Sequence, residues 1–293
     1  MANNNFLNVY KGADSVRKYF DPDLSPPLPL VEITDRLNPY YRDGVRIYAK
    51  MMAVGSTSIS SMSALNLMQD SEVSAKTKTT VQYGSDLMQS SGIDITPLGG
   101  LSQPEALGEH GGVRAAQTQV EEPQIVINPS QYGNEKNWKS HAKWTGPQIL
   151  MQLPEINVIC AGMDTSGAIL GLGTFFKVAK PCVFRLGVCI TTTGQGPGDR
   201  SCAAGPVGLS QQTAVNHVEQ VGWHDSYSCS LELTKDGIIC GPFSGLHLRG
   251  LLQFIENRRS EGSLSSLAGP DGNIHCVFLC CDLPPESFDE HSE

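Results

Sequence analysis

The chain has 293 residues, of which 40% are hydrophobic and 17% are charged, and its formal net charge is −9. These values are typical of a globular protein that buries a core in one large α/β domain or in two smaller ones. Nucleic acid is not an expected partner, because acidic residues are in excess and the basic residues form no stripe. No apolar run approaches the roughly 18 residues of a membrane span, and the start of the chain lacks the layout of a signal peptide. We therefore expect a cytoplasmic protein without membrane contact.

Seven of the nine cysteines lie in apolar segments that are strand-like or helix-like. Such contexts favour buried free thiols over disulfides. The seven are Cys160, Cys182, Cys189, Cys240, Cys276, Cys280 and Cys281. Because no cysteine pair has the spacing of a zinc site, we expect no metal.

Hydrophobic periodicity predicts strands and helices that alternate through most of the chain. In chain order they are an extended, proline-containing arm over 1–27, strand 45–50, helix 63–70, strand 79–83, helix 113–121, strand 124–128, helix 146–153, strand 157–160, helix 165–178, strand 183–190, helix 244–259 and strand 275–281. This alternation indicates a mostly parallel sheet with helices on both faces.

The most informative segment is 158–171, an apolar strand followed by a small, glycine-containing turn and then a helix. In such a loop the backbone N–H groups at the helix start bind an anion. We therefore take Gly162, Thr165, Ser166 and Gly167 as candidate ligand-binding residues.

Asp164 lies inside this loop and opposes anion binding. A carboxylate about 5 Å from a phosphate charge costs about 3 kcal/mol per charge pair at an effective dielectric of about 20. Two interpretations stay open. Asp164 is either a general base whose pKa is raised in a dry site or a cap of the following helix.

Several segments together resemble the fold type II pyridoxal-phosphate enzymes, which include cysteine synthase, cystathionine β-synthase and the tryptophan synthase β chain. The similarity is strongest to cysteine synthase-like proteins, and the segments follow one another in the order of that family. They are 28–32, 47–50, 128–132 with 144–149, 162–167 and 237–245. The resemblance implies an α/β, tryptophan synthase β-like fold with three-layer, parallel-sheet domains.

The same resemblance implies a division of the chain into domains. An extended N-terminal arm covers 1–27, a smaller and trimmed α/β domain covers 45–145, and a larger α/β domain combines 28–44 with 146–293. The smaller domain is called trimmed because of segment 81–99. There the family has a loop that binds the substrate carboxylate, followed by a helix and a strand, and this chain is expected to lack that block. The resemblance also implies a homodimer.

The family holds pyridoxal phosphate as a lysine imine and carries out β-elimination or β-replacement on an amino acid. In this chain Ser60 or Ser61 stands where the imine lysine is expected, and a hydroxyl cannot form an imine. Lys50 corresponds to a strand lysine that is expected to point elsewhere. We therefore expect no cofactor.

Two further departures concern residues that the family places at the ligand. Phe243 stands in a paired-serine segment that hydrogen-bonds the pyridine nitrogen, although Ser244 is retained. Asp164 stands where the family prefers glycine. Gln131 and Tyr132 match a position near the substrate, and either ligand binding or structural hydrogen bonding explains them.

These departures lead to three hypotheses of function. The first is a pyridoxal-phosphate-independent enzyme, a lyase or cyclase that moves a proton on a small organic molecule. Its catalytic candidates are Asp164, Ser60, Ser61 and His247, with His247 three positions after Ser244 on the same predicted helix. The second is an inactive pseudoenzyme that binds a metabolite or regulates a partner enzyme, and in that case the two serines are loop filler. The third is a residual pyridoxal-phosphate-dependent lyase or transferase.

Overall fold

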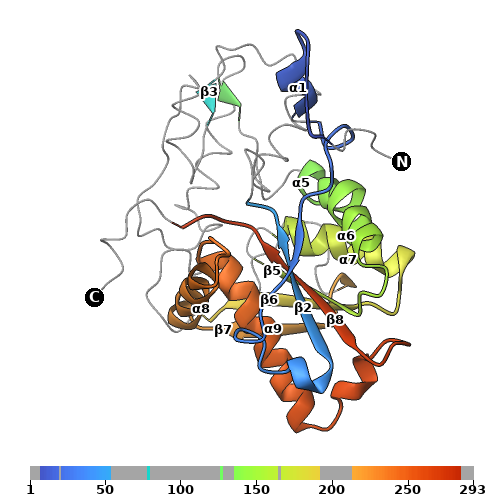
Figure 1. Cartoon of the computed structure of the whole chain (residues 1–293), viewed down its shortest axis with the longest axis vertical. Helices are drawn as coiled ribbons and strands as arrows, with labels where there is room; N and C mark the ends of the chain where they lie inside the picture. The colour runs from blue at the N-terminus through green and yellow to red at the C-terminus, as the bar shows by residue number, and fades with distance from the viewer. Residues whose placement is uncertain are drawn as a thin grey trace.

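Six strands form the central sheet of the protein, in the order β1-β2-β8-β5-β6-β7. They are seen in a computed structural model, which describes residues 7–19, 21–53, 78–79, 126–127, 135–163, 166–191 and 213–284. The strands of this sheet are β1 Leu30–Glu32, β2 Val45–Met51, β5 Val158–Gly162, β6 Phe184–Ile190, β7 His217–Val221 and β8 Ile274–Cys280. All neighbours in the sheet run parallel except β1, which pairs antiparallel with β2 (Figure 1). A second, two-stranded sheet joins β3 (Lys78–Thr79) to β4 (Val126–Ile127).

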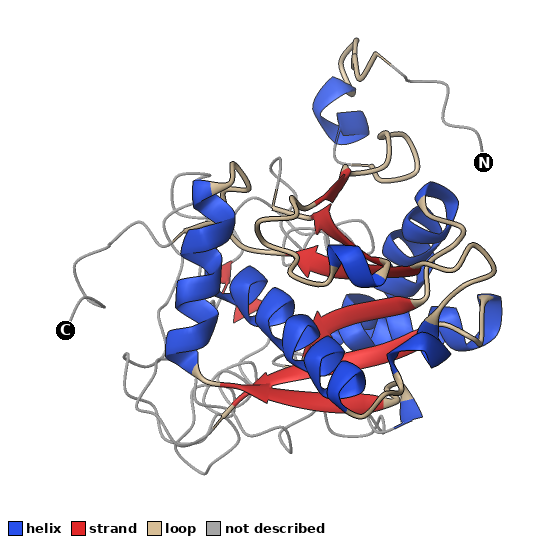
Figure 2. Ribbon diagram, turned by 60° about the horizontal axis from the view of Figure 1, so that its bottom comes forward, coloured by secondary structure: helices blue, strands red, loops and turns tan. Residues whose placement is uncertain are grey.

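Helices cover both faces of the six-stranded sheet, as Figures 1 and 2 show. On one face lie α8 (Trp223–Lys235) and α9 (Pro242–Ser260). On the other face, α5 (Glu135–Ser140) continues through the π-helical turn η3 (His141–Thr145) into α6 (Gly146–Gln152), and α7 (Gly167–Ala179) packs beside them. The remaining short elements are α1 Ser15–Tyr19, η1 Tyr41–Asp43 and η5 Leu264–Leu267. This is the mostly parallel, three-layer α/β architecture that the alternating pattern predicts.

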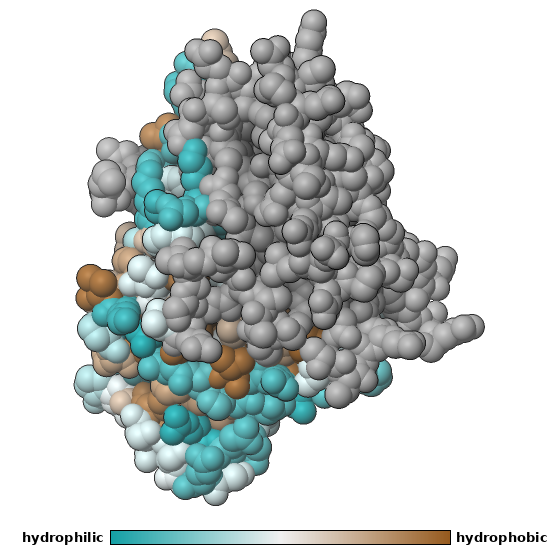
Figure 3. Space-filling model, turned by 180° about the vertical axis from the view of Figure 1, so that it is seen from behind, coloured by the Kyte–Doolittle hydropathy of each residue, from teal (hydrophilic) through white to brown (hydrophobic). Residues whose placement is uncertain are grey.

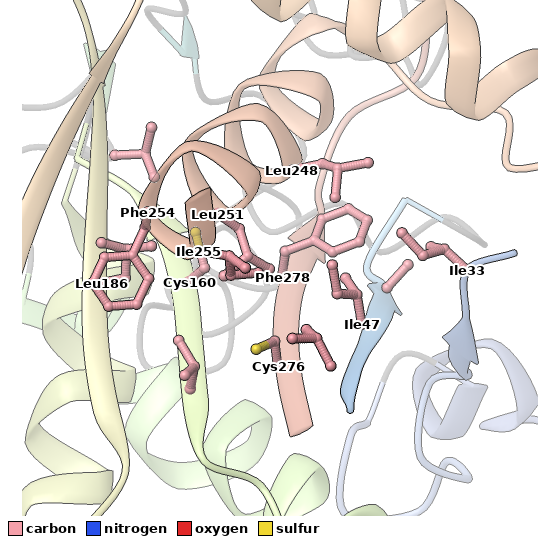
Figure 4. Packing of buried hydrophobic residues seen from close by; sticks show 14 of the residues in the cluster. Ile33, Ile47, Cys160, Leu186, Leu248, Leu251, Phe254, Ile255, Cys276 and Phe278 are labelled. Atoms are coloured by element: carbon pink, nitrogen blue, oxygen red, sulfur yellow. The ribbon is translucent and has the colours of Figure 1, made fainter. Parts of the chain in front are cut away.

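The core consists of two apolar layers, one on each side of the sheet. In the larger layer, Leu248 and Leu251 of α9 pack against Phe278 of β8 (Figure 4). Every residue of β8 is buried, as expected for a central parallel strand that is covered on both faces. A Cβ at Gly250 would lie 2.6 Å from Val188, so α9 approaches β6 more closely there than a larger residue allows.

Most predicted elements that fall in described residues are confirmed, with end points that differ by a few residues. The strand at 45–51 is β2 and belongs to the six-stranded sheet, although the resemblance assigns 45–145 to a smaller domain. The domain division itself stays a prediction, because the predicted helices 63–70 and 113–121 lie outside the described residues. The arm over 1–27 is not extended throughout, since 15–19 form α1, whose backbone includes a bond from the Lys18 amide to the Asp14 carbonyl.

Two cysteines differ from the expectation of buried free thiols. Cys182 is exposed, because it lies in the turn between α7 and β6 and not in the strand itself. Cys189 is disulfide-bonded. The other five of the seven are free, and all except the half-buried Cys281 are buried.

The described surface on the face in Figure 3 is largely hydrophilic, with smaller hydrophobic areas between. Among the described helices, none is both long and apolar enough to cross a membrane. Within the same residues, no group of three or more histidine, cysteine, aspartate or glutamate side chains is arranged to hold a metal ion.

Candidate functional site

The candidate site lies where the carboxyl ends of β5 and β8 meet the amino ends of α7 and α9. β5 ends at Gly162 and α7 begins at Gly167, while β8 ends at Cys280 and α9 begins at Pro242. Ligands of open α/β sheets bind outside the carboxyl ends of the strands. Helix amino ends also present unpaired N–H groups and the positive end of the helix dipole.

His247 is the one predicted catalytic residue that the described chain contains, and its tautomer is fixed by its surroundings. Its Nδ1 lies 2.7 Å from the carbonyl oxygen of Leu279. Because a carbonyl oxygen only accepts hydrogen bonds, Nδ1 carries the proton and Nε2 carries the lone pair. Among the described residues, Nε2 has no hydrogen-bond partner.

The imidazole of His247 lies directly against Gly162 at the end of β5. A Cβ at Gly162 would lie 2.5 Å from Nε2, so only glycine leaves room for the ring. The side chain is 4% exposed. Burial lowers its pKa, while the Leu279 carbonyl and the charge of Asp282 act in the opposite direction. The ring is therefore neutral at pH 7 and available as a base.

Asp282, two residues beyond β8, caps the amino end of α9. Its carboxylate accepts the backbone N–H of Phe243 at 2.9 Å and that of Ser244 at 2.8 Å. It also accepts the hydroxyl proton of Ser244, whose oxygen in turn accepts the backbone N–H of Cys281 at 2.9 Å. An anion at this position is stabilised by the helix dipole and satisfies two otherwise unpaired amides.

This capping determines whether the Ser244 hydroxyl can hydrogen-bond a pyridine nitrogen, which is the role that the family resemblance assigns to Ser244. The Ser244 side chain is fully buried, and its only proton is donated to Asp282. The hydroxyl therefore presents no donor to a ligand. At this end of the site, the described residues do not fit pyridoxal phosphate.

The turn before α7 keeps part of the expected anion-binding form. Ser166 adopts a left-handed conformation with φ 58°, and its hydroxyl donates to the Met163 carbonyl at 2.9 Å. It is the N-cap of α7 but makes no side-chain capping bond, so Ser166 leaves the first amides of the helix without a side-chain acceptor. Gly167 packs directly on the Asn137 side chain.

Lys50 points away from this site, as expected. Its side chain is fully buried, and Nζ donates to the Leu28 carbonyl at 2.7 Å and to the amide oxygens of Gln152 and Gln148 at 2.8 and 3.1 Å. Burial without a carboxylate partner lowers its pKa to about 7. The amine thus links β2 to α6 and to the segment that precedes β1.

The structure brings five of the predicted site residues to one end of the sheet: Gly162, Ser166, Gly167, Ser244 and His247. The other six lie outside the described residues, and their roles stay predictions: Ser60, Ser61, Gln131, Tyr132, Asp164 and Thr165. The sequence reasoning missed Asp282, although its position just after the last strand is a signal that it reaches the same edge. The homodimer also stays a prediction.

No family model matches the chain. A cysteine synthase of Aquifex aeolicus is 28% identical over 156 residues, which make up 51% of this chain and 48% of the relative. The chain thus matches about half the length of that relative.

Solved structures agree over a larger part of the chain. O-ureido-L-serine synthase superposes with a TM-score of 0.69 at 15% identity, and the match covers 89% of this chain and 90% of the other. A hydrogen sulfide-producing enzyme from Fusobacterium nucleatum superposes with a TM-score of 0.67 at 17% identity, over 89% and 97% of the two chains. The chain therefore has the cysteine synthase-like scaffold of the fold type II pyridoxal-phosphate enzymes.

Proposed function

We propose that this protein is an enzyme that acts without pyridoxal phosphate on a small organic molecule, with His247 as the group that removes or returns a proton. The observation that carries the proposal is the hydrogen bond from Nδ1 of His247 to the Leu279 carbonyl. It leaves Nε2 as an acceptor without a partner among the described residues, at the end of β5, where ligands of open α/β sheets bind. A lyase or cyclase reaction that begins with proton removal fits this arrangement.

The electrostatic surroundings of His247 suit a general base. Burial keeps the ring neutral before reaction, as a base at pH 7 must be. Once Nε2 takes a proton, the Leu279 carbonyl and the negative charge of Asp282 stabilise the imidazolium. The protein therefore holds both the base and the groups that support its charged form.

The amino end of α7 supplies the complementary group. Its N–H groups follow the turn that begins just after Gly162, beside Nε2 of His247. Such amides stabilise an oxygen that becomes negative when a neighbouring C–H loses its proton. The substrate class is accordingly a small carbonyl compound or carboxylic acid with an acidic C–H bond.

Independence from pyridoxal phosphate is supported by three sets of side chains. Ser60 and Ser61 carry no amine at the imine position. Nζ of Lys50 donates hydrogen bonds to three acceptors on α6 and on the segment before β1. The Ser244 hydroxyl donates to Asp282. Pyridoxal phosphate, when bound by an enzyme, supplies an electron sink for carbanions. Here we assign the stabilisation of negative charge to the α7 amides instead.

Hydrogen–deuterium exchange at the substrate carbon tests this proposal. The intact protein is incubated in deuterated buffer with a panel of small 2-oxo acids, 2-hydroxy acids and amino acids, and exchange is followed by NMR. We expect exchange with at least one compound, slowed by about a hundredfold or more in His247→Gln. His224→Gln is the matched control, because the His224 side chain is 94% exposed on α8.

Two results would contradict the enzyme proposal: no exchange with any compound, or exchange that His247→Gln leaves unchanged. Independence from the cofactor is tested separately by titration with pyridoxal phosphate, borohydride reduction and mass spectrometry. A pyridoxyl adduct on any lysine would show that the protein is a residual pyridoxal-phosphate enzyme.

One observation favours the second candidate function, an inactive binding protein. At the α9 end, Ser244 and the carboxylate of Asp282 are bonded to each other, and His247 is 4% exposed. Side chains that satisfy one another leave fewer groups for a substrate. Saturable binding of a compound from the same panel, without any exchange, would support this role.

A further inference from the structure

A second cluster of reactive side chains lies toward the opposite end of the sheet. Tyr48 of β2, His275 of β8 and Asp271 of the turn before β8 form one hydrogen-bonded chain. At a strand rise of about 3.3 Å per residue, His275 is about 20 Å from Cys281, which borders the first site. The cluster is therefore separate from the site around His247.

The hydrogen bonds fix the role of each ring nitrogen of His275. Nε2 lies 2.8 Å from Oδ2 of Asp271, and a carboxylate only accepts, so Nε2 carries the proton. Nδ1 then accepts the hydroxyl proton of Tyr48, whose oxygen is 3.3 Å away. An acid that orients a histidine, which in turn faces a hydroxyl, is the arrangement of an activated nucleophile.

The surrounding residues hold this chain in place. The Asn273 backbone N–H donates to Asp271 at 3.2 Å, and its side-chain amide does so at 3.0 Å. The backbone N–H of His275 donates to the Asn157 side chain at 2.7 Å. The rings of Tyr48 and His275 are stacked with an angle of 24° between their planes.

The solvent exposure of Tyr48 and His275 differs as expected for a nucleophile and the base that activates it. The His275 side chain is 8% exposed, whereas Tyr48 is only partly buried. Tyr48 is therefore the more exposed member of the pair, while the imidazole is protected. Burial and the charges of Glu32 and Glu155 raise the pKa of Tyr48 to about 12. The phenol thus stays protonated at neutral pH and needs a base to react.

Arg46 supplies positive charge on the same face of β2. It lies two positions before Tyr48, and alternate residues of a strand share a face. Its Nη1 is buried and has no hydrogen-bond partner among the described residues. The guanidinium lies over the Tyr41 ring, and its positive charge also acts on the Tyr48 phenol, so it favours an oxygen that gains negative charge during reaction.

We propose that Tyr48, His275 and Asp271 form a second reactive site, at which Tyr48 accepts an acyl group from a neutral activated ester. The Tyr48 oxygen forms a bond to the carbonyl carbon as its proton passes to Nδ1 of His275. The tetrahedral intermediate then collapses, the bond to the leaving oxygen breaks, and that oxygen takes the proton from His275. The products are an ester of Tyr48 and the free alcohol or phenol, and no oxidant or reductant is involved.

The charge of the neighbours sets the substrate class. Glu32 is the cross-strand partner of Tyr48, and Glu155 and Asp271 also act on its phenol against the one positive charge of Arg46, so anionic esters are repelled. Neutral esters are the expected donors. The site is independent of the function proposed for His247, because the two share no residue.

Acetylation of the intact protein by p-nitrophenyl acetate tests the proposal, with peptide mass spectrometry to locate the acetyl group. We expect Tyr48 to react first and the rate at Tyr48 to fall by about a hundredfold in His275→Gln. Asp271→Asn should slow it as well, and Tyr48→Phe should remove the fast phase of p-nitrophenol release. Tyr41 is an internal control, because it is 41% exposed and lies under the Arg46 guanidinium but has no histidine partner among the described residues.

The proposal is overturned if Tyr41 reacts as fast as Tyr48, or if both His275→Gln and Asp271→Asn leave the rate at Tyr48 unchanged. Circular dichroism and the rate at Tyr41 show whether each variant is folded. Should His275→Gln fail to fold, Asp271→Asn decides the outcome alone, since its isosteric side chain keeps the shape of the turn. An ester with an anionic acyl group should react more slowly than the acetate, and equal rates would contradict the assigned substrate class.

Discussion

Nε2 of His247 lies 2.5 Å from the point where the side chain of any residue other than glycine at position 162 would begin. The position of a base on α9 is thus set by the absence of a side chain on β5. In Gly162→Ala the ring has to move, and its bond to the Leu279 carbonyl is strained or lost. We expect proton exchange to fall by about tenfold or more, because a misplaced base loses much of its effect, and the free energy of unfolding to fall by about 1–3 kcal/mol.

Denaturant unfolding and the exchange assay measure these two effects. Gly222→Ala is the control, because the nearest atom to a Cβ there is Thr191 Oγ1 at 4.0 Å and its φ of −69° suits alanine. If Gly162→Ala exchanged the substrate proton at the wild-type rate, His247 would not be the catalytic base.

Because the amine of Lys50 is buried, we expect an unusual dependence of the free energy of unfolding on pH. Burial lowers its pKa to about 7 from an ordinary value of 10.5. Between these values the unfolded chain binds a proton that the folded chain has released, so the free energy of unfolding rises with pH. This lysine contributes at most about 1.4 kcal/mol per pH unit. Below pH 7 both states carry the proton, and the contribution of Lys50 no longer changes.

Guanidinium unfolding at pH values from about 7 to 10 measures this slope. Lys50→Met should flatten it, although the variant loses the hydrogen bonds to three partly buried acceptors and is less stable at every pH. Lys180→Met is the comparison, because Lys180 also donates to two carbonyl oxygens, of Pro154 and Ile156, but is partly exposed. If wild type and Lys50→Met had the same slope, the buried amine would not be the titrating group.

Local pattern was sufficient to predict the four inner strands of the six-stranded sheet, β2, β8, β5 and β6, but not its edge strands β1 and β7 or all of the helices. β5 and β8 are continuous apolar runs, and α7 and α9 bury 7 of their 13 and 10 of their 19 residues, so their types and order follow from the sequence. In contrast, α8 buries only three of its 13 residues, and the edge strand β7 buries only Glu219 and Val221. Segments that bury so few of their residues acquire their structure from packing against neighbours, which a local pattern does not contain.

The site was less predictable than the fold, because its bonds join distant parts of the chain. The Asp282 carboxylate accepts the Ser244 amide across 38 positions, and Nδ1 of His247 donates to the Leu279 carbonyl across 32. In neither pair are the two residues close enough in sequence to form a recognisable motif. The family resemblance pointed to Ser244, but only the folded chain showed that its hydroxyl donates a hydrogen bond to a carboxylate.

Asp282 predicts a local contribution to stability at the start of α9. In Asp282→Ala, two backbone amides and the Ser244 hydroxyl lose their acceptor, and we expect a loss of about 1–2 kcal/mol in the free energy of unfolding. Asp282→Asn keeps an oxygen acceptor but removes the charge at the helix end, so its loss should be smaller. Denaturant unfolding compares them with Asp225→Ala, whose 57% exposed side chain lies in the first turn of α8. Equal stability of the wild type and Asp282→Ala would show that the cap is not needed.

Asp271 predicts the behaviour of the protein in acid. Hydrogen bonds from His275 and then from Asn273 hold the pKa of this carboxyl well below its usual range. A carboxyl with a lowered pKa in the folded state stabilises the protein fully above its ordinary pKa of about 4, and this contribution is lost as the pH falls below that value. Asp271→Asn should therefore flatten the fall in melting temperature below about pH 4, measured by thermal unfolding. Asp43→Asn removes a surface ion pair with Arg259 and should change this fall little, since such pairs stabilise weakly. If Asp271→Asn followed the wild-type curve throughout, the carboxyl would be protonated with its ordinary pKa, and the bond that orients His275 toward Tyr48 would be too weak for the reaction proposed there.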